Sequence, residues 1–77
     1  MLYKIERNLM MLEQEYKYEV ISADLKLYRF IVNGGETIIN CDPDRKYFQI
    51  INDTIGTMEY KSSKGIINRL FDLYNRK

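Results

Sequence analysis

The chain has 77 residues, of which 45% are hydrophobic, with a formal net charge of +1 and a single cysteine. This length predicts one domain over residues 1–77, and the lone Cys41 excludes an internal disulfide framework and fits a reducing compartment. No apolar run approaches the roughly 20 residues that span a bilayer. We therefore expect a cytoplasmic protein without membrane association.

The first predicted element is a helix from about Leu2 to Gln14. Its apolar residues recur at spacings of three and four, which is typical of an amphipathic helix. Met10 and Met11 widen this stripe and are expected to fill gaps in the core. A strand over residues 2–6 is the alternative. The stripe consists of Leu2, Ile5, Leu9, Leu12 and Tyr16.

Residues 16–21 alternate with a period of two and predict a strand. The next three residues, 22–24, are a polar connection to a second strand. A loop of two residues would invert the faces of the first strand, because a slip of one residue inverts a strand. We favour a loop of three residues, because it gathers aromatic and β-branched side chains on one face. These side chains are Tyr16, Tyr18, Val20, Tyr28, Phe30 and Val32.

The strongest local signal is a hairpin over Leu25–Cys41, with two apolar, β-branched runs flanking Asn33-Gly34-Gly35. Asn-Gly and Gly-Gly tolerate the positive φ angles that tight hairpin turns require. A loop of Asn33-Gly34 and one of Gly34-Gly35 give different pairings but the same faces. Both place Thr37, Ile39 and Cys41 on the face of Phe30.

The rest of the chain predicts two more strands and a helix. Residues 42–45 form a turn, because proline presets φ and aspartate accepts backbone hydrogen bonds. Strands are predicted over residues 47–52 and 57–60, and a helix runs from a cap at Ser62 or Ser63 to about Asn75. Its apolar stripe should cover the face of Phe30, Ile39 and Ile50. The stripe consists of Ile66, Ile67, Leu70, Phe71 and Tyr74.

Together these elements predict a small α+β domain. An N-terminal helix precedes a four- to five-stranded antiparallel meander, and a C-terminal amphipathic helix packs on one face of the sheet.

The residue types argue against catalysis. The chain has no histidine, which excludes His-type metal sites and Ser-His or Cys-His nucleophile pairs. Cys41 lies on the predicted core face, where a thiol acts as a small hydrophobic group. Asp42, Asp44 and Asp53 could meet at one end of the sheet, but we interpret them as turn residues. We expect no catalytic residues, no metal and no cofactor, and hence no enzyme.

A candidate anion site opens the last helix, at Lys61, Ser62, Ser63, Lys64 and Gly65. Backbone N–H groups at a helix start, two hydroxyls and two ammonium groups suit a phosphate or a carboxylate. Residues 61–77 carry five basic side chains and one acidic side chain, which adds to this basic end of the chain. The alternative is a solvated helix start that is capped by serine.

The second face of the predicted sheet is a candidate partner-binding surface. It is more apolar than a sheet face in water should be, and arginine and tyrosine among aliphatic residues are typical of interface centres. In the alternative interpretation, the N-terminal helix covers this face. The candidate residues are Leu27, Arg29, Ile31, Ile38, Tyr47 and Ile51.

These observations favour a small protein-interaction module that docks on a larger protein. Residues with AT-rich codons are abundant in the chain, as in many phage, virus and plasmid genes, so we expect an inhibitor of a host protein such as a defence nuclease, acting in the host cytoplasm. The alternative is a module that binds single- or double-stranded nucleic acid through sheet tyrosines and the basic helix start. A homo-oligomer formed through an open sheet face or edge is a further alternative.

Overall fold

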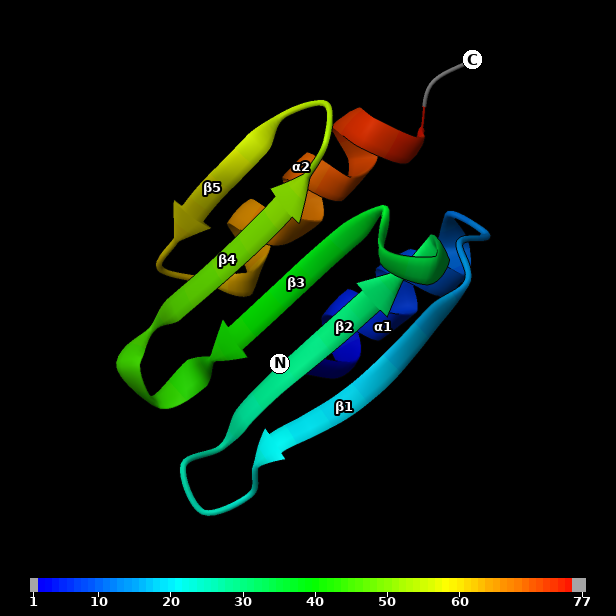
Figure 1. Cartoon of the computed structure of the whole chain (residues 1–77). Helices are drawn as coiled ribbons and strands as arrows, with labels where there is room; N and C mark the ends of the chain where they lie inside the picture. Colours follow the sequence, from blue (N-terminus) through cyan, green and yellow to red (C-terminus); the bar gives the residue numbers. More distant parts are fainter. Residues whose placement is uncertain (1, 76–77) are drawn as a thin grey trace.

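Two helices and five strands make up the fold, which the computed structural model describes over residues 2–75. The strands form one antiparallel sheet in the order β1-β2-β3-β4-β5, so each strand pairs with its neighbour in the sequence (Figure 1). This confirms the predicted α+β meander. The elements are α1 (Leu2–Met11), β1 (Tyr16–Ser22), β2 (Leu27–Val32), η1 (Asn33–Gly35), β3 (Thr37–Asp42), η2 (Pro43–Arg45), β4 (Tyr47–Asn52), β5 (Gly56–Tyr60) and α2 (Ser63–Tyr74).

The hairpin predicted from the Asn-Gly-Gly motif joins β2 to β3. Val32 pairs with Thr37, which is the register of the Gly34-Gly35 alternative. The φ angles of Asn33, Gly34 and Gly35 are 51°, 70° and 111°. Glycine adopts such positive angles at little cost because it has no Cβ. The three residues of the motif therefore adopt the positive φ angles on which the prediction of a hairpin turn was based.

The first hairpin has the predicted faces but a different loop. Tyr18 lies opposite Phe30, which confirms that the two share a face. The predicted loop of three residues is wrong, because Ser22 pairs with Leu27 and the register shifts just before Ser22. Residues 23–26 make the connection. The irregularity takes up one residue, so the alternation along the rest of β1 is kept.

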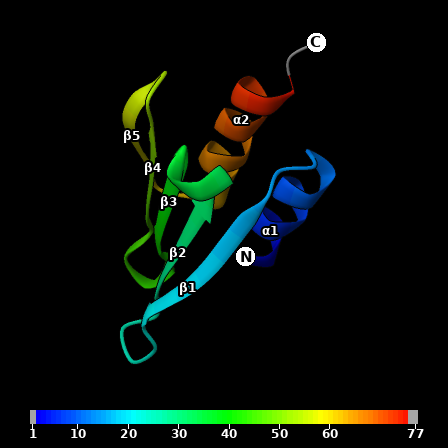
Figure 2. The ribbon, with the colours of Figure 1, turned by 45° about the vertical axis from the view of Figure 1, so that its right-hand side comes forward.

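Both helices pack on the same face of the sheet (Figures 1 and 2). Ile5 and Leu9 of α1, together with Ile66 and Leu70 of α2, are fully buried in one core with the strands. This excludes the alternative in which α1 covers the second face, and no element within residues 2–75 covers that face. The strands contribute Phe30, Val32, Ile39, Cys41, Phe48 and Ile50 to the core.

The helix α1 is shorter than predicted, and it buries Ile5 and Leu9 of the predicted stripe, with Leu12 packed against the core. It ends at Met11, and Met10 and Met11 are 65% and 68% exposed, so the expectation that they fill the core is wrong. The buried positions follow spacings of three and four from Ile5 through Asn8 and Leu9, and Asn8 is only 6% exposed. Met10 and Met11 lie outside this stripe, because successive helical residues are about 100° apart.

The helix α2 lies where the sequence predicts it, with Ser62 at the N-cap position. Leu70 is fully buried, whereas Phe71 is 38% exposed and does not belong to the central core. The buried stripe passes on from Leu70 to Leu73 and Tyr74, which pack against the core. Neither described helix is long and apolar enough to cross a membrane.

A polar network fastens the end of α2 to the sheet. The Asn52 Nδ2 group donates to Thr37 Oγ1 at 2.7 Å, and the Tyr74 hydroxyl donates to Glu36 Oε2 at 2.7 Å. Thr37 and Tyr74 also share a hydrogen bond through their hydroxyls. Thr37 is fully buried and Asn52 is 6% exposed, so these bonds satisfy groups that water does not reach. Burial raises the pKa of Tyr74.

Candidate interaction face

The face of the sheet opposite the helices, here called the open face, carries a line of polar side chains across its middle. Arg29 lies opposite both Glu19 and Asn40, and Asn40 lies opposite Gln49. Arg29 Nε donates to Asn40 Oδ1 at 3.0 Å, and Asn40 Nδ2 donates to Gln49 Oε1 at 3.0 Å. An Arg29 nitrogen lies 3.8 Å from a Glu19 carboxylate oxygen. These four residues, with Glu59 opposite Gln49, form the polar row.

One apolar row flanks the polar row on its first side. Ile38 lies between Ile31 and Ile51, because each pairs with it across a neighbouring strand. Ile51 is 37% exposed, and Ile31 and Ile38 are half-buried. Three adjacent isoleucines on an uncovered face are unusual, because a sheet face in water normally carries polar residues at such positions.

Leu27 and Tyr47 lie on the other side of the polar row, where they and Ile21 line a hollow. Tyr47 is 38% exposed and Ile21 is 48% exposed. The Tyr47 hydroxyl donates to Glu59 Oε2 at 2.8 Å, and this hydrogen bond raises the pKa of Tyr47.

The six residues predicted for a partner surface thus all lie on one uncovered face of the sheet. The sequence interpretation missed the hydrogen bonding of the polar row, which follows only from the register.

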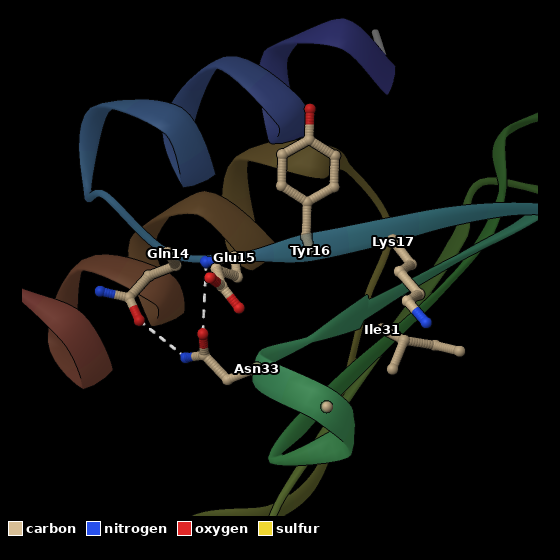
Figure 3. Close-up of a pocket in the computed structure, with 7 residues that line it drawn as sticks. Gln14, Glu15, Tyr16, Lys17, Ile31 and Asn33 are labelled. Carbon is tan, nitrogen blue, oxygen red and sulfur yellow. Dashed lines mark hydrogen bonds between the residues drawn. The ribbon is translucent and has the colours of Figure 1, made fainter.

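A wide depression lies at the start of β1, beside the central turn (Figure 3). The Asn33 side chain spans it, accepting a hydrogen bond from Glu15 N at 3.2 Å and donating one to Gln14 Oε1 at 2.7 Å. Lys17 and Ile31 extend the depression towards the open face. Asn33 thus holds the connection between α1 and β1, a role that its position in a turn motif did not predict.

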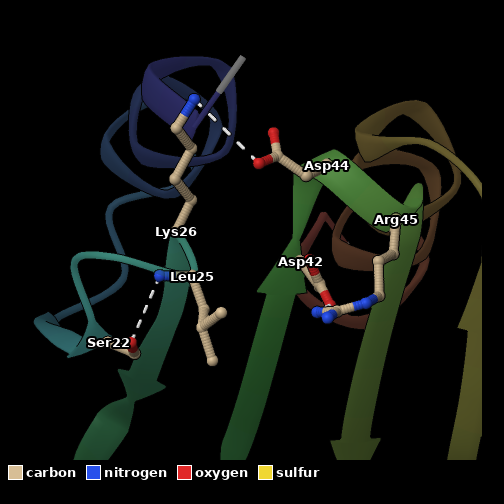
Figure 4. A network of polar contacts seen from close by, with 6 residues as sticks. All are labelled: Ser22, Leu25, Lys26, Asp42, Asp44 and Arg45. Atoms are coloured by element: carbon tan, nitrogen blue, oxygen red, sulfur yellow. Dashed lines mark hydrogen bonds and ion pairs between the residues drawn. The ribbon is translucent and has the colours of Figure 1, made fainter.

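A smaller hollow of about 250 Å³ lies at the opposite end of the open face, between Leu27 and Tyr47. Asp42 lines it and is 9% exposed; its Oδ2 accepts from Arg45 at 3.0 Å, while its buried Oδ1 has no hydrogen-bond partner. Figure 4 shows this pair beside the contact of 4.0 Å between Lys26 and Asp44. That ion pair joins two exposed turns and contributes little, because solvent screens it.

The aspartates considered for a cation do not meet. Asp42 and Asp44 lie at the turn before β4, whereas Asp53 follows the far end of β4. Within residues 2–75, no group of three or more His, Cys, Asp or Glu side chains is arranged to hold a metal ion.

The residues of the candidate anion site are only partly available. Lys61, Ser62 and Lys64 are exposed, but Ser63 is only 7% exposed, so one of the two hydroxyls is withdrawn from the surface. Gly65 is needed for packing, because the Tyr60 side chain occupies the space where a side chain at position 65 would lie. A Cβ atom at Gly65 would lie 2.4 Å from two atoms of the Tyr60 ring. The basic residues Arg76 and Lys77 lie outside the described residues.

The tyrosines considered for base stacking are divided between the two sides of the sheet. Tyr47 lies on the open face, opposite Asp42. Tyr28 and Tyr60 pack against the core on the helix side, and the Tyr60 hydroxyl accepts a hydrogen bond from Arg69 Nε at 3.0 Å. The sheet therefore does not gather these rings into one stacking platform of the kind that single-stranded nucleic acids use.

Cys41 lies in the core, as its position on the alternating strand predicts. It is 2% exposed, and burial raises its pKa to about 12. The thiolate is the reactive form of cysteine, so this environment favours the structural role that the sequence indicates.

Comparison with known protein families, with curated proteins and with solved structures finds no significant match to this chain.

Proposed function

We propose that this chain is a non-catalytic interaction module that docks on a larger protein through the open face of its sheet. The observation that carries the proposal is the position of both helices on one side of the sheet. Their position leaves the isoleucine row and the Leu27–Tyr47 hollow exposed. Uncovered apolar side chains on both sides of a polar row are typical of a protein-binding site.

The polar row suits coverage by a partner. Arg29, Asn40 and Gln49 already hydrogen-bond to one another within the chain. A partner that covers them does not have to satisfy every donor and acceptor, and an unsatisfied buried group costs about 1–3 kcal/mol. The aliphatic rows on either side then contribute the favourable burial of apolar surface. Arginine with aromatic and aliphatic neighbours is also the composition found at interface centres.

The residue composition favours an inhibitor as the form of this activity. The abundance of residues with AT-rich codons is typical of phage, virus and plasmid genes. Small proteins from such genes commonly act by covering a surface of a host enzyme. A defence nuclease of the host is the class of target that we expect.

The proposal is tested by affinity capture from a lysate of the host, using three tagged forms. The test variant is Ile51→Glu, which places a charge beside Ile38 on the open face, where Ile51 is 37% exposed. The matched control is Met10→Glu, because Met10 is 65% exposed on α1, on the other side of the sheet. Circular dichroism checks that all three forms keep the fold.

The expected result is one protein that survives nuclease treatment and is recovered by the wild type and by Met10→Glu. Its recovery with Ile51→Glu should fall by about tenfold or more, as for a central interface residue. Equal recovery by Ile51→Glu would overturn the proposal. Recovery that is lost after nuclease treatment and falls steeply with salt would instead indicate the nucleic-acid alternative.

A further inference from the structure

The strand β1 is an edge strand with little of the usual protection along its middle. It has seven residues, Tyr16–Ser22, and pairs only with β2; Figures 1 and 2 show it at the outer margin of the sheet. Proteins normally protect such edges with proline, bulges, short strands or charged side chains. This strand has no proline, its irregularity lies at its end, after Val20, and its two charged residues, Lys17 and Glu19, are of opposite sign. The opposite edge, β5, has five residues.

The hydrogen-bonding direction of β1 follows from one contact at its start. Asn33 N–H donates to the Glu15 carbonyl at 2.8 Å, so the backbone groups of Glu15 point towards β2. Backbone groups alternate in direction along an antiparallel strand. The N–H and C=O groups of Tyr16, Tyr18 and Val20 therefore point away from the sheet, where a further strand would bind them.

The side chains beside these groups are also accessible. Tyr18 is 42% exposed and Val20 is 53% exposed. The Tyr18 ring stacks on Tyr28 with their centroids 5.7 Å apart and is therefore held in place. An apolar side chain that is ordered and exposed next to free backbone groups favours β-strand addition.

We propose that two copies of this chain associate by antiparallel pairing of their β1 strands, centred on Tyr18. In this register Lys17 of each copy lies opposite Glu19 of the other, and Tyr16 lies opposite Val20. Moving the register by one step in either direction places Lys17 opposite Lys17 or Glu19 opposite Glu19. Opposite charges across a strand pair are stabilising and like charges are destabilising, so charge complementarity selects the register centred on Tyr18.

The charges are available for this pairing. Lys17 is exposed. The Glu19 side chain is 48% exposed, and its contact with Arg29 is long, at 3.8 Å. The arrangement has twofold symmetry, so it uses both β1 edges and closes at a dimer. The inference does not depend on the proposed function, because the backbone edge of β1 pairs the two copies and the isoleucine row on the open face takes no part, although Glu19 borders both surfaces.

The test measures the dimer dissociation constant by sedimentation equilibrium from micromolar to millimolar concentrations. Lys17→Glu and Glu19→Lys each replace two attractive pairs with two repulsive pairs, and each should raise the constant by about tenfold or more. An equimolar mixture of the two variants should form a heterodimer, because it places the introduced carboxylate opposite the introduced ammonium group. Lys64→Glu, on α2, is the control for the same change of charge.

Amide exchange locates the interface. The amides of Tyr16, Tyr18 and Val20 should exchange more slowly as the concentration rises, and this protection should be lost in Lys17→Glu. The amides of Lys17 and Glu19 point towards β2 and should be protected throughout. A wild-type protein that stays monomeric at millimolar concentration would overturn the proposal. It would also fail if a dimer formed that neither charge variant weakens and that leaves the three amides unprotected.

Discussion

Replacing Gly65 with alanine tests whether this glycine is needed for packing. Gly→Ala within a helix normally stabilises a protein by up to about 1 kcal/mol. Here the added Cβ would lie 2.4 Å from Cγ and Cδ1 of Tyr60 and 2.8 Å from its Cβ. The near atoms are at the base of the side chain, so rotating the ring about its own axis cannot relieve the contact. Forced overpacking of this kind costs about 1–3 kcal/mol.

The expected net effect of Gly65→Ala is therefore a loss of about 1–2 kcal/mol of unfolding free energy. Urea denaturation followed by circular dichroism measures it as a lower midpoint. The matched background is Tyr60→Ala, in which the ring is absent and Gly65→Ala should be neutral or stabilising. A higher midpoint for Gly65→Ala in the wild-type background would refute the packing role and leave Gly65 available to the anion site.

Two further predictions concern the core and the polar network. Burial raises the pKa of Cys41 from 9.0 to about 12, so its thiolate fraction at neutral pH falls by about a thousandfold. A thiol reagent should therefore modify the native protein far more slowly than the urea-unfolded protein, and equal rates would contradict the buried position. Asn52→Ala should lower the free energy of unfolding by about 2–3 kcal/mol in urea denaturation. It removes the hydrogen bond that Asn52 donates to Thr37, and it leaves the backbone N–H groups of Thr54 and Ile55 without their acceptor, Asn52 Oδ1. A change below about 0.5 kcal/mol, the range of ordinary surface substitutions, would show that water replaces these bonds.

The faces of the sheet could be predicted from the sequence because alternation along a strand is a local property. Phe30, Ile39 and Ile50 share a face whichever turn connects their strands, provided that each loop keeps the same parity. The loop lengths were harder to predict. The irregularity before Ser22 changes the length of the loop between β1 and β2 without changing which side chains share a face. Alternation along the sequence thus predicts which side of each strand is buried, but it predicts the ends of the strands less well.

The side on which α1 packs could not be predicted in the same way. Its buried stripe includes Asn8, a polar residue, and excludes Met10 and Met11. The spacing of Ile5, Leu9 and Leu12 nevertheless indicates the correct side of the helix, because all three pack in or against the core. Which face of the sheet α1 covers depends on packing against α2 and the strands, and this contact joins residues far apart in the sequence.

The candidate site was predictable in its residues but not in its chemistry. Arg29 and Ile38 were identified from their alternation, whereas the hydrogen bonds from Arg29 to Asn40 and on to Gln49 depend on register. Similarly, Gly65 resembles part of an anion-binding helix start in the sequence. Its contact with Tyr60 becomes visible only when β5 and α2 are placed together.

The meander has a consequence for how the chain folds during synthesis. Every strand pairs with its neighbour in the sequence, so the hairpins can form one after another as they leave the ribosome. The core differs, because Ile5 and Leu9 are made before the sheet and meet Ile66 and Leu70, which are made after it. Closing such a long loop is the slow and entropically costly step. The part of the core face that α2 covers therefore stays exposed until α2 has been translated, and this interval is when the chain most needs a chaperone.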